Sequence, residues 1–303
     1  MRRLTTALFA AFALASAGLA QAAELLDATP RTAVISAFQP ELTALAAATE
    51  DKQTYEAVGV VFVTGKLEGK PVVLFLSGVS MVNAAMTTQV LLDRFKVERI
   101  VFSGIAGGVD PALDVGDVVV ADKWGQYLET HFARETAGRF APPERHTTGV
   151  PAGAFGMMFT QSVSIAHGAS APEERFWFPV DPGLYAVART MPAVTLKRCI
   201  ESQCLVRAPR LVVGGAGVSG PTFVDNAAFR EYAFRTFDAK VLDMETAAVA
   251  HVAYANGKTP FIAFRSLSDL AGGDAGANQA RTFFQLASDN SAAVVRSFLK
   301  ALP

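Results

Sequence analysis

The segment LDMETAAVAHVAYANGKTPFIAFRSLSD, from Leu242 to Asp269, is the most informative part of this chain for its fold. Residues 247–255 are small and apolar and are followed by Asn256-Gly257, which predicts a buried helix with a glycine stop. Residues 260–264 form a short apolar run that is typical of a strand. In open α/β sheets, ligands bind at the edge where such strands end, so we expect a binding site there.

Charged and hydroxyl side chains flank this helix and strand. Glu245 stands just before the helix, and Arg265, Ser268 and Asp269 stand at the predicted end of the strand. Two separated carboxylates can converge on one pocket, where one holds a sugar and the other protonates a leaving group. The stretch alone leaves a structural alternative equally open, in which Asp269 caps the next helix and Glu245 pairs with Arg265.

The composition predicts a folded protein with a sizeable core. The chain has 303 residues, of which 51% are hydrophobic and 18% charged, so general disorder is excluded. The net charge of -1 supplies no basic excess to meet phosphates, so no nucleic-acid partner is expected.

The first residues have the pattern of an export signal. Residues 1–3 are basic at two positions, residues 4–20 are apolar or small, and residues 20–22 give the A-x-A pattern of a cleavage site. We therefore predict a signal peptide over residues 1–22, with an uncleaved anchor as the alternative. No later run is long enough to span a bilayer, so we expect a periplasmic or secreted protein that is free of the membrane after cleavage.

Export to an oxidising compartment would allow the two cysteines to form a disulfide. Cys199 and Cys204 have four residues between them, and in an oxidising compartment such a pair is expected to form a disulfide that closes a small loop. A metal site would need more ligands, and the four histidines are scattered without ligand spacing. We expect neither a metal nor a cofactor.

The rest of the chain alternates strands and helices. A strand at residues 32–37 leads into a helix at 42–48, which puts Glu41 near a helix N-terminus. A functional role is one interpretation of Glu41. The alternative is that its carboxylate only stabilises the helix by interacting with the helix dipole. Further elements are predicted as a hairpin of residues 58–66 and 71–76, helices at 83–95, 184–189, 227–236 and 280–302, and strands at 118–121 and 209–213.

Two glycine-rich segments follow predicted strands. Residues 104–108, GIAGG, are expected to form a turn after the strand at 100–102, with backbone N–H groups that can approach a ligand at Gly107 and its neighbours; a turn without a ligand is the alternative. Residues 215–220, GAGVSG, have the spacing of a dinucleotide fingerprint, but Pro221 follows at once and no helix opens, so we expect a plain turn there.

The least regular segment is residues 123–208. We interpret it as a lid or insertion that covers one side of the fold, within a single domain of residues 23–303, because the strand pattern resumes at residue 209.

Three motifs together resemble the nucleoside phosphorylase superfamily: SGIAGGVDPALDVGDV from Ser103, DMETAAVAHV from Asp243, and RSLSD from Arg265. Within it they are most similar to methylthioadenosine/S-adenosylhomocysteine nucleosidases, while FWFPVD and the cysteine pair resemble secreted plant relatives that include bark storage proteins. The resemblance covers residues 32–122 and 210 onward. It implies an α/β fold, a three-layer α/β/α sandwich with a mixed, partly barrel-like central sheet.

The resemblance also implies a role for each matching residue. Glu41 matches the carboxylate that activates the attacking water, and Asp269 matches the acid that protonates the purine at N7. Other positions implied to contact or support a substrate are Ala106, Gly107, Phe223, which stacks on the base, Val224, which binds its edge, Met244 and Glu245, which hold the sugar, and Arg265 and Ser268, which orient the carboxylates.

The choice between water and phosphate as nucleophile depends on cations. Related phosphorylases carry an arginine and a hydroxyl at positions that match Phe102 and Ile105, and the first loop offers Gln39 and Glu41 but no arginine. We therefore expect a hydrolase that cleaves the N-glycosidic bond of a small purine nucleoside. A phosphate-dependent phosphorylase and a non-catalytic nucleoside-binding or storage protein are the alternatives. Family members are commonly oligomers, so a homodimer or higher homo-oligomer is expected.

Overall fold

The structure is a computed structural model, and it describes residues 24–143 and 149–303. The predicted signal peptide, residues 1–22, lies outside the described residues. No helix in the described part of the chain combines the length and the apolar character needed to cross a membrane.

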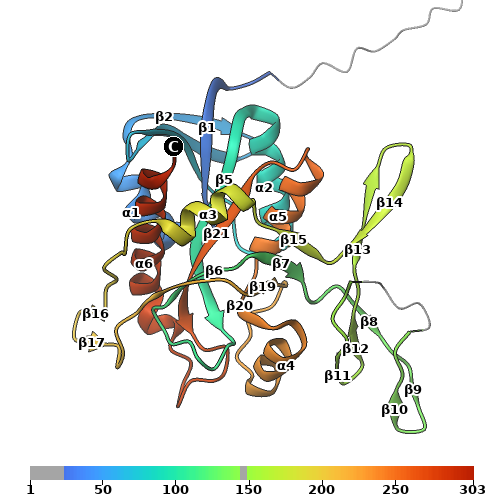
Figure 1. Cartoon of the computed structure of the whole chain (residues 1–303). Coiled ribbons are helices and arrows are strands. Elements are labelled where there is room, and N and C mark those ends of the chain that lie inside the picture. The colour runs from blue at the N-terminus through green and yellow to red at the C-terminus, as the bar shows by residue number, and fades with distance from the viewer. Residues whose placement is uncertain (1–23, 144–148) are drawn as a thin grey trace, which may run out of the picture.

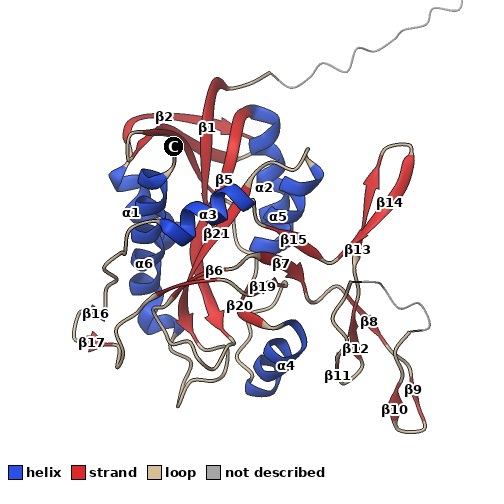
Figure 2. Ribbon diagram, viewed as in Figure 1, coloured by secondary structure: helices blue, strands red, loops and turns tan. Residues whose placement is uncertain are grey.

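A mixed sheet of twelve strands forms the centre of the molecule (Figures 1 and 2). Its strands are β1 (Asp27–Ser36), β2 (Glu50–Ala57), β3 (Val60–Leu67), β4 (Lys70–Leu76), β5 (Phe95–Gly108), β6 (Val118–Val120), β7 (Lys123–Gln126), β15 (Trp177–Pro179), β18 (Leu211–Val213), β19 (Ala216–Ser219), β20 (Ala239–Asp243) and β21 (Phe261–Asp269). β5 runs parallel to β1 and to β21 and antiparallel to β20. Because one long strand has three neighbours, the sheet branches and curves back on itself at β5.

The helices in the described part of the chain pack around this sheet: α1 (Gln39–Ala48), α2 (Met81–Arg94), α3 (Pro182–Thr190), α4 (Ala227–Phe237), α5 (Thr246–Ala255) and α6 (Ala280–Ala301). α1 and α6 pack together on one face, and α2 and α5 pack together on the other (Figure 1). Phe264 of β21 packs on Phe298 of α6 with ring centroids 4.8 Å apart. The predicted α/β/α sandwich with a mixed sheet is confirmed.

Three strands differ from the prediction. β5 continues through the GIAGG segment and β21 continues to Asp269, so neither segment is a turn or a loop at a strand end. The segment GAGVSG contributes β19 rather than a plain turn. The physical reason is close packing: a Cβ at Gly104 would lie 2.0 Å from Arg265 Nη1 and 2.6 Å from Glu41 Oε1, so glycine there makes room inside a strand.

β2 was missed entirely. Its sequence, EDKQTYEA, has no apolar alternation, and most of its side chains are exposed. It lies at the edge of the sheet beside β3, where polar residues keep the open strand edge soluble.

The segment of residues 123–208 contributes β7 and β15 to the central sheet, but most of its other strands form two-stranded hairpins and one small three-stranded sheet, together called the projecting hairpins, that extend away from it (Figures 1 and 2). The projecting strands are β8 (Thr130–Phe132), β9 (Glu135–Thr136), β10 (Arg139–Phe140), β11 (Ala154–Phe155), β12 (Met158–Thr160), β13 (Val163–His167) and β14 (Ser170–Arg175). These strands extend outward from the end of the sheet rather than across it (Figure 1), and the interpretation of residues 123–208 as a lid or insertion within one domain stays a prediction.

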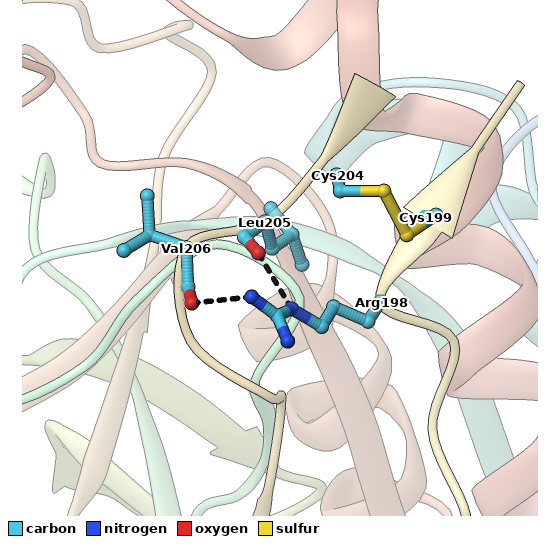
Figure 3. Close-up of a disulfide and its surroundings, with 5 residues drawn as sticks. All are labelled: Arg198, Cys199, Cys204, Leu205 and Val206. Atoms are coloured by element: carbon cyan, nitrogen blue, oxygen red, sulfur yellow. Dashed lines mark hydrogen bonds between the residues drawn. A yellow bond between two sulfur atoms is a disulfide. The ribbon is translucent and has the colours of Figure 1, made fainter. Parts of the chain in front are cut away.

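The two cysteines form the expected disulfide. It joins the hairpin of β16 (Cys199–Ile200) and β17 (Gln203–Cys204), as Figure 3 shows. Arg198 closes the base of the same loop by donating hydrogen bonds to the carbonyl oxygens of Leu205 and Val206, both at 2.8 Å.

Candidate active site

A cavity of about 240 Å³ opens where β1, β4, β19, β20 and β21 end. This is the carboxyl edge of the parallel strands, where ligands bind in open α/β sheets. The described residues that line it are Ala37, Phe38, Glu41, Val79, Ile105, Ala106, Gly107, Thr222, Phe223, Val224, Leu242, Asp243, Met244, Glu245, Ser268, Asp269 and Phe284. None of these is basic, and none comes from residues 123–208.

Glu41 stands in the first turn of α1 and is buried. Its Oε2 accepts hydrogen bonds from the backbone N–H groups of Ala37 at 2.6 Å and Phe38 at 3.4 Å, and its Oε1 accepts from Ile105 at 2.8 Å. Burial raises the pKa of the Glu41 carboxyl, and the nearby Arg265 guanidinium opposes that shift. The backbone N–H of Ile105 thus serves Glu41, and the chain around it fixes the carboxylate on one side of the cavity.

Arg265 lies behind the cavity rather than in its wall, and its side chain is fully buried. Its Nε lies 2.7 Å from Asp243 Oδ2, its Nη2 lies 3.4 Å from Glu245 Oε2, and its Nη1 lies 3.8 Å from Glu41 Oε1. Its guanidinium also stacks over the Phe102 ring at 4.0 Å. One cation therefore serves three carboxylates, and Nη1 has no hydrogen-bond partner in the described part of the chain.

Glu245 is buried just before α5 and faces the cavity. Its Oε1 accepts a hydrogen bond from the Ser80 backbone N–H at 2.8 Å. Burial raises the pKa of Glu245 to about 7, against the pull of Arg265 and with help from the negative charge of Asp243. The pairing of Glu245 with Arg265 and its convergence with the other carboxylates are both present, so these two alternatives from the sequence are compatible.

Asp269, the last residue of β21, is buried and lines the same cavity. Its Oδ2 accepts from Ser268 Oγ at 2.8 Å, and its Oδ1 accepts from the backbone N–H of Ala271 at 2.8 Å and from Asn278 Nδ2 at 3.5 Å. Burial raises the pKa of Asp269 above its usual range. Asp269 does not cap α6, which begins eleven residues later at Ala280.

Apolar side chains complete the walls. Phe223 is 56% exposed at the edge of the cavity and Val224 is buried beside it, while Met244 and Ala106 line the interior. The structure thus brings together every residue that the sequence pointed to except Arg265, which supports the wall from behind, and the cysteines, which lie in a separate hairpin.

The sequence reasoning missed three contributors. Asp243 makes the shortest contact to Arg265, and its Oδ1 accepts the backbone N–H of Thr246 at 3.2 Å at the start of α5. Phe38 and Phe284 pack edge to face, with ring centroids 6.0 Å apart, on one wall of the cavity. Asp243 had a signal in the DMET motif, whereas nothing near Phe284 in the sequence distinguishes it from a core residue of α6.

Comparison with known proteins identifies the family to which this chain belongs. A sequence model described as the phosphorylase superfamily matches residues 31–300. The chain is 30% identical to a 5'-methylthioadenosine/S-adenosylhomocysteine nucleosidase of Marinomonas sp. over 268 residues, which is 88% of this chain and 97% of that one. It is 27% identical to bark storage protein B of Populus deltoides, over 84% of this chain and 81% of that one.

Comparison with solved structures finds the same kind of nucleosidase. The nucleosidase of Colwellia psychrerythraea in complex with adenine superposes with a TM-score of 0.67 at 27% identity, covering 92% of this chain and 97% of that chain. The nucleosidase of Neisseria meningitidis in complex with methylthio-immucillin-A superposes with a TM-score of 0.66 at 26% identity, covering 90% and 99%.

Proposed function

The chain belongs to the phosphorylase superfamily, and on that premise we propose that it hydrolyses the N-glycosidic bond of purine nucleosides, as methylthioadenosine/S-adenosylhomocysteine nucleosidases do. The observation that carries this proposal is the convergence of Glu41, Glu245 and Asp269 on one cavity whose described lining residues include no cation. Breaking such a bond produces an electron-rich purine and an oxocarbenium-like sugar, and acids on two sides of the substrate serve both fragments.

Asp269 is the proposed general acid. A carboxyl that stays protonated near neutral pH can donate its proton to the departing purine, and burial raises the pKa of Asp269 in that direction. Ser268 fixes the orientation of Oδ2 by its hydrogen bond. Phe223 and Val224, beside the acid in the cavity wall, are suited to stack on the base and to contact its edge.

Glu41 is the proposed base for the attacking water. Three backbone N–H groups fix its carboxylate, so it can aim a water toward the anomeric carbon. The unpartnered Arg265 Nη1 lies 3.8 Å from Glu41 Oε1, a separation across which a bridging water can be held. Glu245, with Met244 beside it, is then placed for the sugar hydroxyls.

Water is favoured over phosphate by the charges around the cavity. A phosphate dianion needs cationic side chains or a nest of free backbone N–H groups. The Arg265 guanidinium behind the cavity is committed to three carboxylates, and the Ile105 N–H is bonded to Glu41. The carboxylates around the cavity would also repel the phosphate dianion.

We also propose a periplasmic or secreted location, on the basis of the predicted signal peptide, and a homo-oligomeric state. Exposed apolar side chains near the cavity support the second proposal: Val82 is 81% exposed and Met86 is 47% exposed on α2. A monomeric mass in solution would contradict it.

The test is to incubate the purified mature protein with methylthioadenosine, S-adenosylhomocysteine and adenosine, with and without inorganic phosphate. Free base and free sugar, formed equally well in both conditions, are expected. A sugar 1-phosphate that appears only with phosphate would identify a phosphorylase, and tight binding without any product would identify a binding or storage protein.

A further inference from the structure

The hydrogen bonds around Asp269 disfavour the protonated form that a general acid needs. Three donors, the Ala271 N–H, the Ser268 hydroxyl and the Asn278 amide, all point at its carboxylate oxygens. Donors of this kind favour the ionised form of a carboxyl group, which is the form that cannot give a proton to a leaving purine. Burial raises the pKa of Asp269 and so opposes the effect of these donors. A second group that opposes the donors lies in the loop that follows β21.

This loop turns tightly and returns toward Asp269. Ala271 and Gly272 both adopt left-handed backbone conformations, with φ of 53° and 92°, and the Gly273 N–H donates to the Leu270 carbonyl at 2.9 Å. Gly272 has no room for a side chain, since a Cβ there would lie 2.3 Å from the backbone nitrogen of Asn226. The turn brings the carboxylate of Asp274 back to the residue directly after the acid: the Leu270 N–H donates to Asp274 Oδ2 at 3.2 Å.

The Asp274 carboxylate has no cation to neutralise it. No ion pair joins it to a basic residue in the described part of the chain, and its Oδ1 is buried without a hydrogen-bond partner. Arg230 of α4 packs against Gly273, but its Nε donates to the Gly108 carbonyl at 3.0 Å. An unpaired negative charge that is hydrogen-bonded to the residue directly after Asp269 disfavours a second negative charge on Asp269.

Other charged groups around Asp269 are committed elsewhere. Arg265, on the same strand, contacts Glu41, Asp243 and Glu245. Asp225, in the loop before α4, is exposed and reaches Asp269 only through Asn278, whose Nδ2 lies 3.2 Å from Asp225 Oδ1. Asp274 is the carboxylate whose charge acts with burial to raise the pKa of Asp269.

We propose that Asp274 is a positioning residue for the proton of Asp269: its unpaired carboxylate, one tight turn beyond the acid, favours the protonated form of Asp269 against the three donors that surround it. This inference rests on the proposed hydrolase function, in which Asp269 supplies the proton to the purine. Asp274 itself is not among the described residues that line the cavity.

The test compares the pH profiles of kcat/KM for the wild type, Asp274→Asn and Asp225→Asn. Loss of the Asp269 proton produces the basic limb of this profile, so Asp274→Asn is expected to move that limb to lower pH and to leave the rate at low pH within about twofold of the wild type. Each pH unit of displacement corresponds to a rate about tenfold lower on the alkaline side. Asp225→Asn, which also removes one negative charge near Asn278, is expected to leave the limb in place.

Asp274→Glu keeps the charge and is expected to hold the basic limb closer to that of the wild type than Asp274→Asn does. An unmoved limb in Asp274→Asn, equal displacement in Asp225→Asn or Asp274→Glu, or a uniform loss of rate at every pH would each overturn the inference. Absence of base release by the wild type would instead refute the proposed function, so the two failures are distinguishable.

Discussion

The cavity and the projecting hairpins of residues 123–208 are built in opposite ways. The cavity takes its polar groups from the ends of central strands and the starts of helices, and Glu41, Ser268 and Asp269 are each at most 2% exposed, as is Arg265 behind the cavity wall. The hairpins have strands of two to six residues, many of their side chains are exposed, and none of their described residues reaches the cavity.

This difference separates the residues proposed to carry out the reaction from the projecting hairpins, whose described residues do not line the cavity. Catalytic geometry tolerates little displacement, so it is held by long strands whose every side chain is packed, as in β21. Short two-stranded hairpins contribute little stability of their own and can change without moving the site. Substitutions at the site and in the periphery should therefore differ strongly in their effects.

Glu41→Gln removes the proposed base and keeps the side-chain shape. We expect kcat to fall by about 10³-fold, within the range for loss of a general base, while substrate binding measured by calorimetry changes little. Glu135→Gln, the same change in a projecting hairpin, is the matched control and should leave kcat unaltered. A Glu41→Gln enzyme within tenfold of the wild type would contradict the role of Glu41.

Gly104→Ala places a methyl group inside β5, 2.0 Å from Arg265 Nη1 and 2.6 Å from Glu41 Oε1. Because both side chains are buried, overpacking should cost about 3 kcal/mol in the free energy of unfolding and lower kcat/KM at least tenfold. Denaturant titration and steady-state kinetics measure the two effects. Gly276→Ala, where a Cβ meets nothing within 4 Å, is the control; equal behaviour of the two variants would show that the strand tolerates displacement.

Glu245 should make folding stability depend on pH. Its folded pKa of about 7 lies above the ordinary value of 4.5, so the folded state binds the proton more tightly and stability declines as pH rises from about 4.5 through 7. The decline due to this group amounts to at most about 3 kcal/mol. Glu245→Gln should flatten the slope of the unfolding free energy between pH 5 and 8. Parallel slopes for the variant and the wild type would rule out this charge as the cause.

Replacement of both cysteines by serine should have the smallest effect. The loop that the disulfide closes is short, so its loss is expected to lower the free energy of unfolding by about 2 kcal/mol. The hairpin lies outside the cavity lining, so kcat and KM should remain within about twofold of the wild type. A marked fall in kcat would connect this peripheral region to the site and break the proposed division.

Part of this structure could be predicted from the sequence because it depends on local patterns. Periodicity placed α5, α6 and the core of β21, and the polar residues at their ends, Glu245 and Asp269, do lie at one cavity. The pattern could not show that β5 runs on through GIAGG, since glycines read as a turn unless the large side chains that need their space are known.

Short-range spacing and motifs were enough to predict the α/β/α class, the disulfide partners and the identities of the acidic residues. The folded chain was needed to show that Arg265 lies among Glu41, Asp243 and Glu245, that Asp274 returns toward Asp269, and that the projecting hairpins point away from the sheet. These facts arise from contacts between residues far apart in the chain or from the exact path of a turn. Burial and unpaired charge, which set the chemistry of the carboxylates, exist only once the chain has folded.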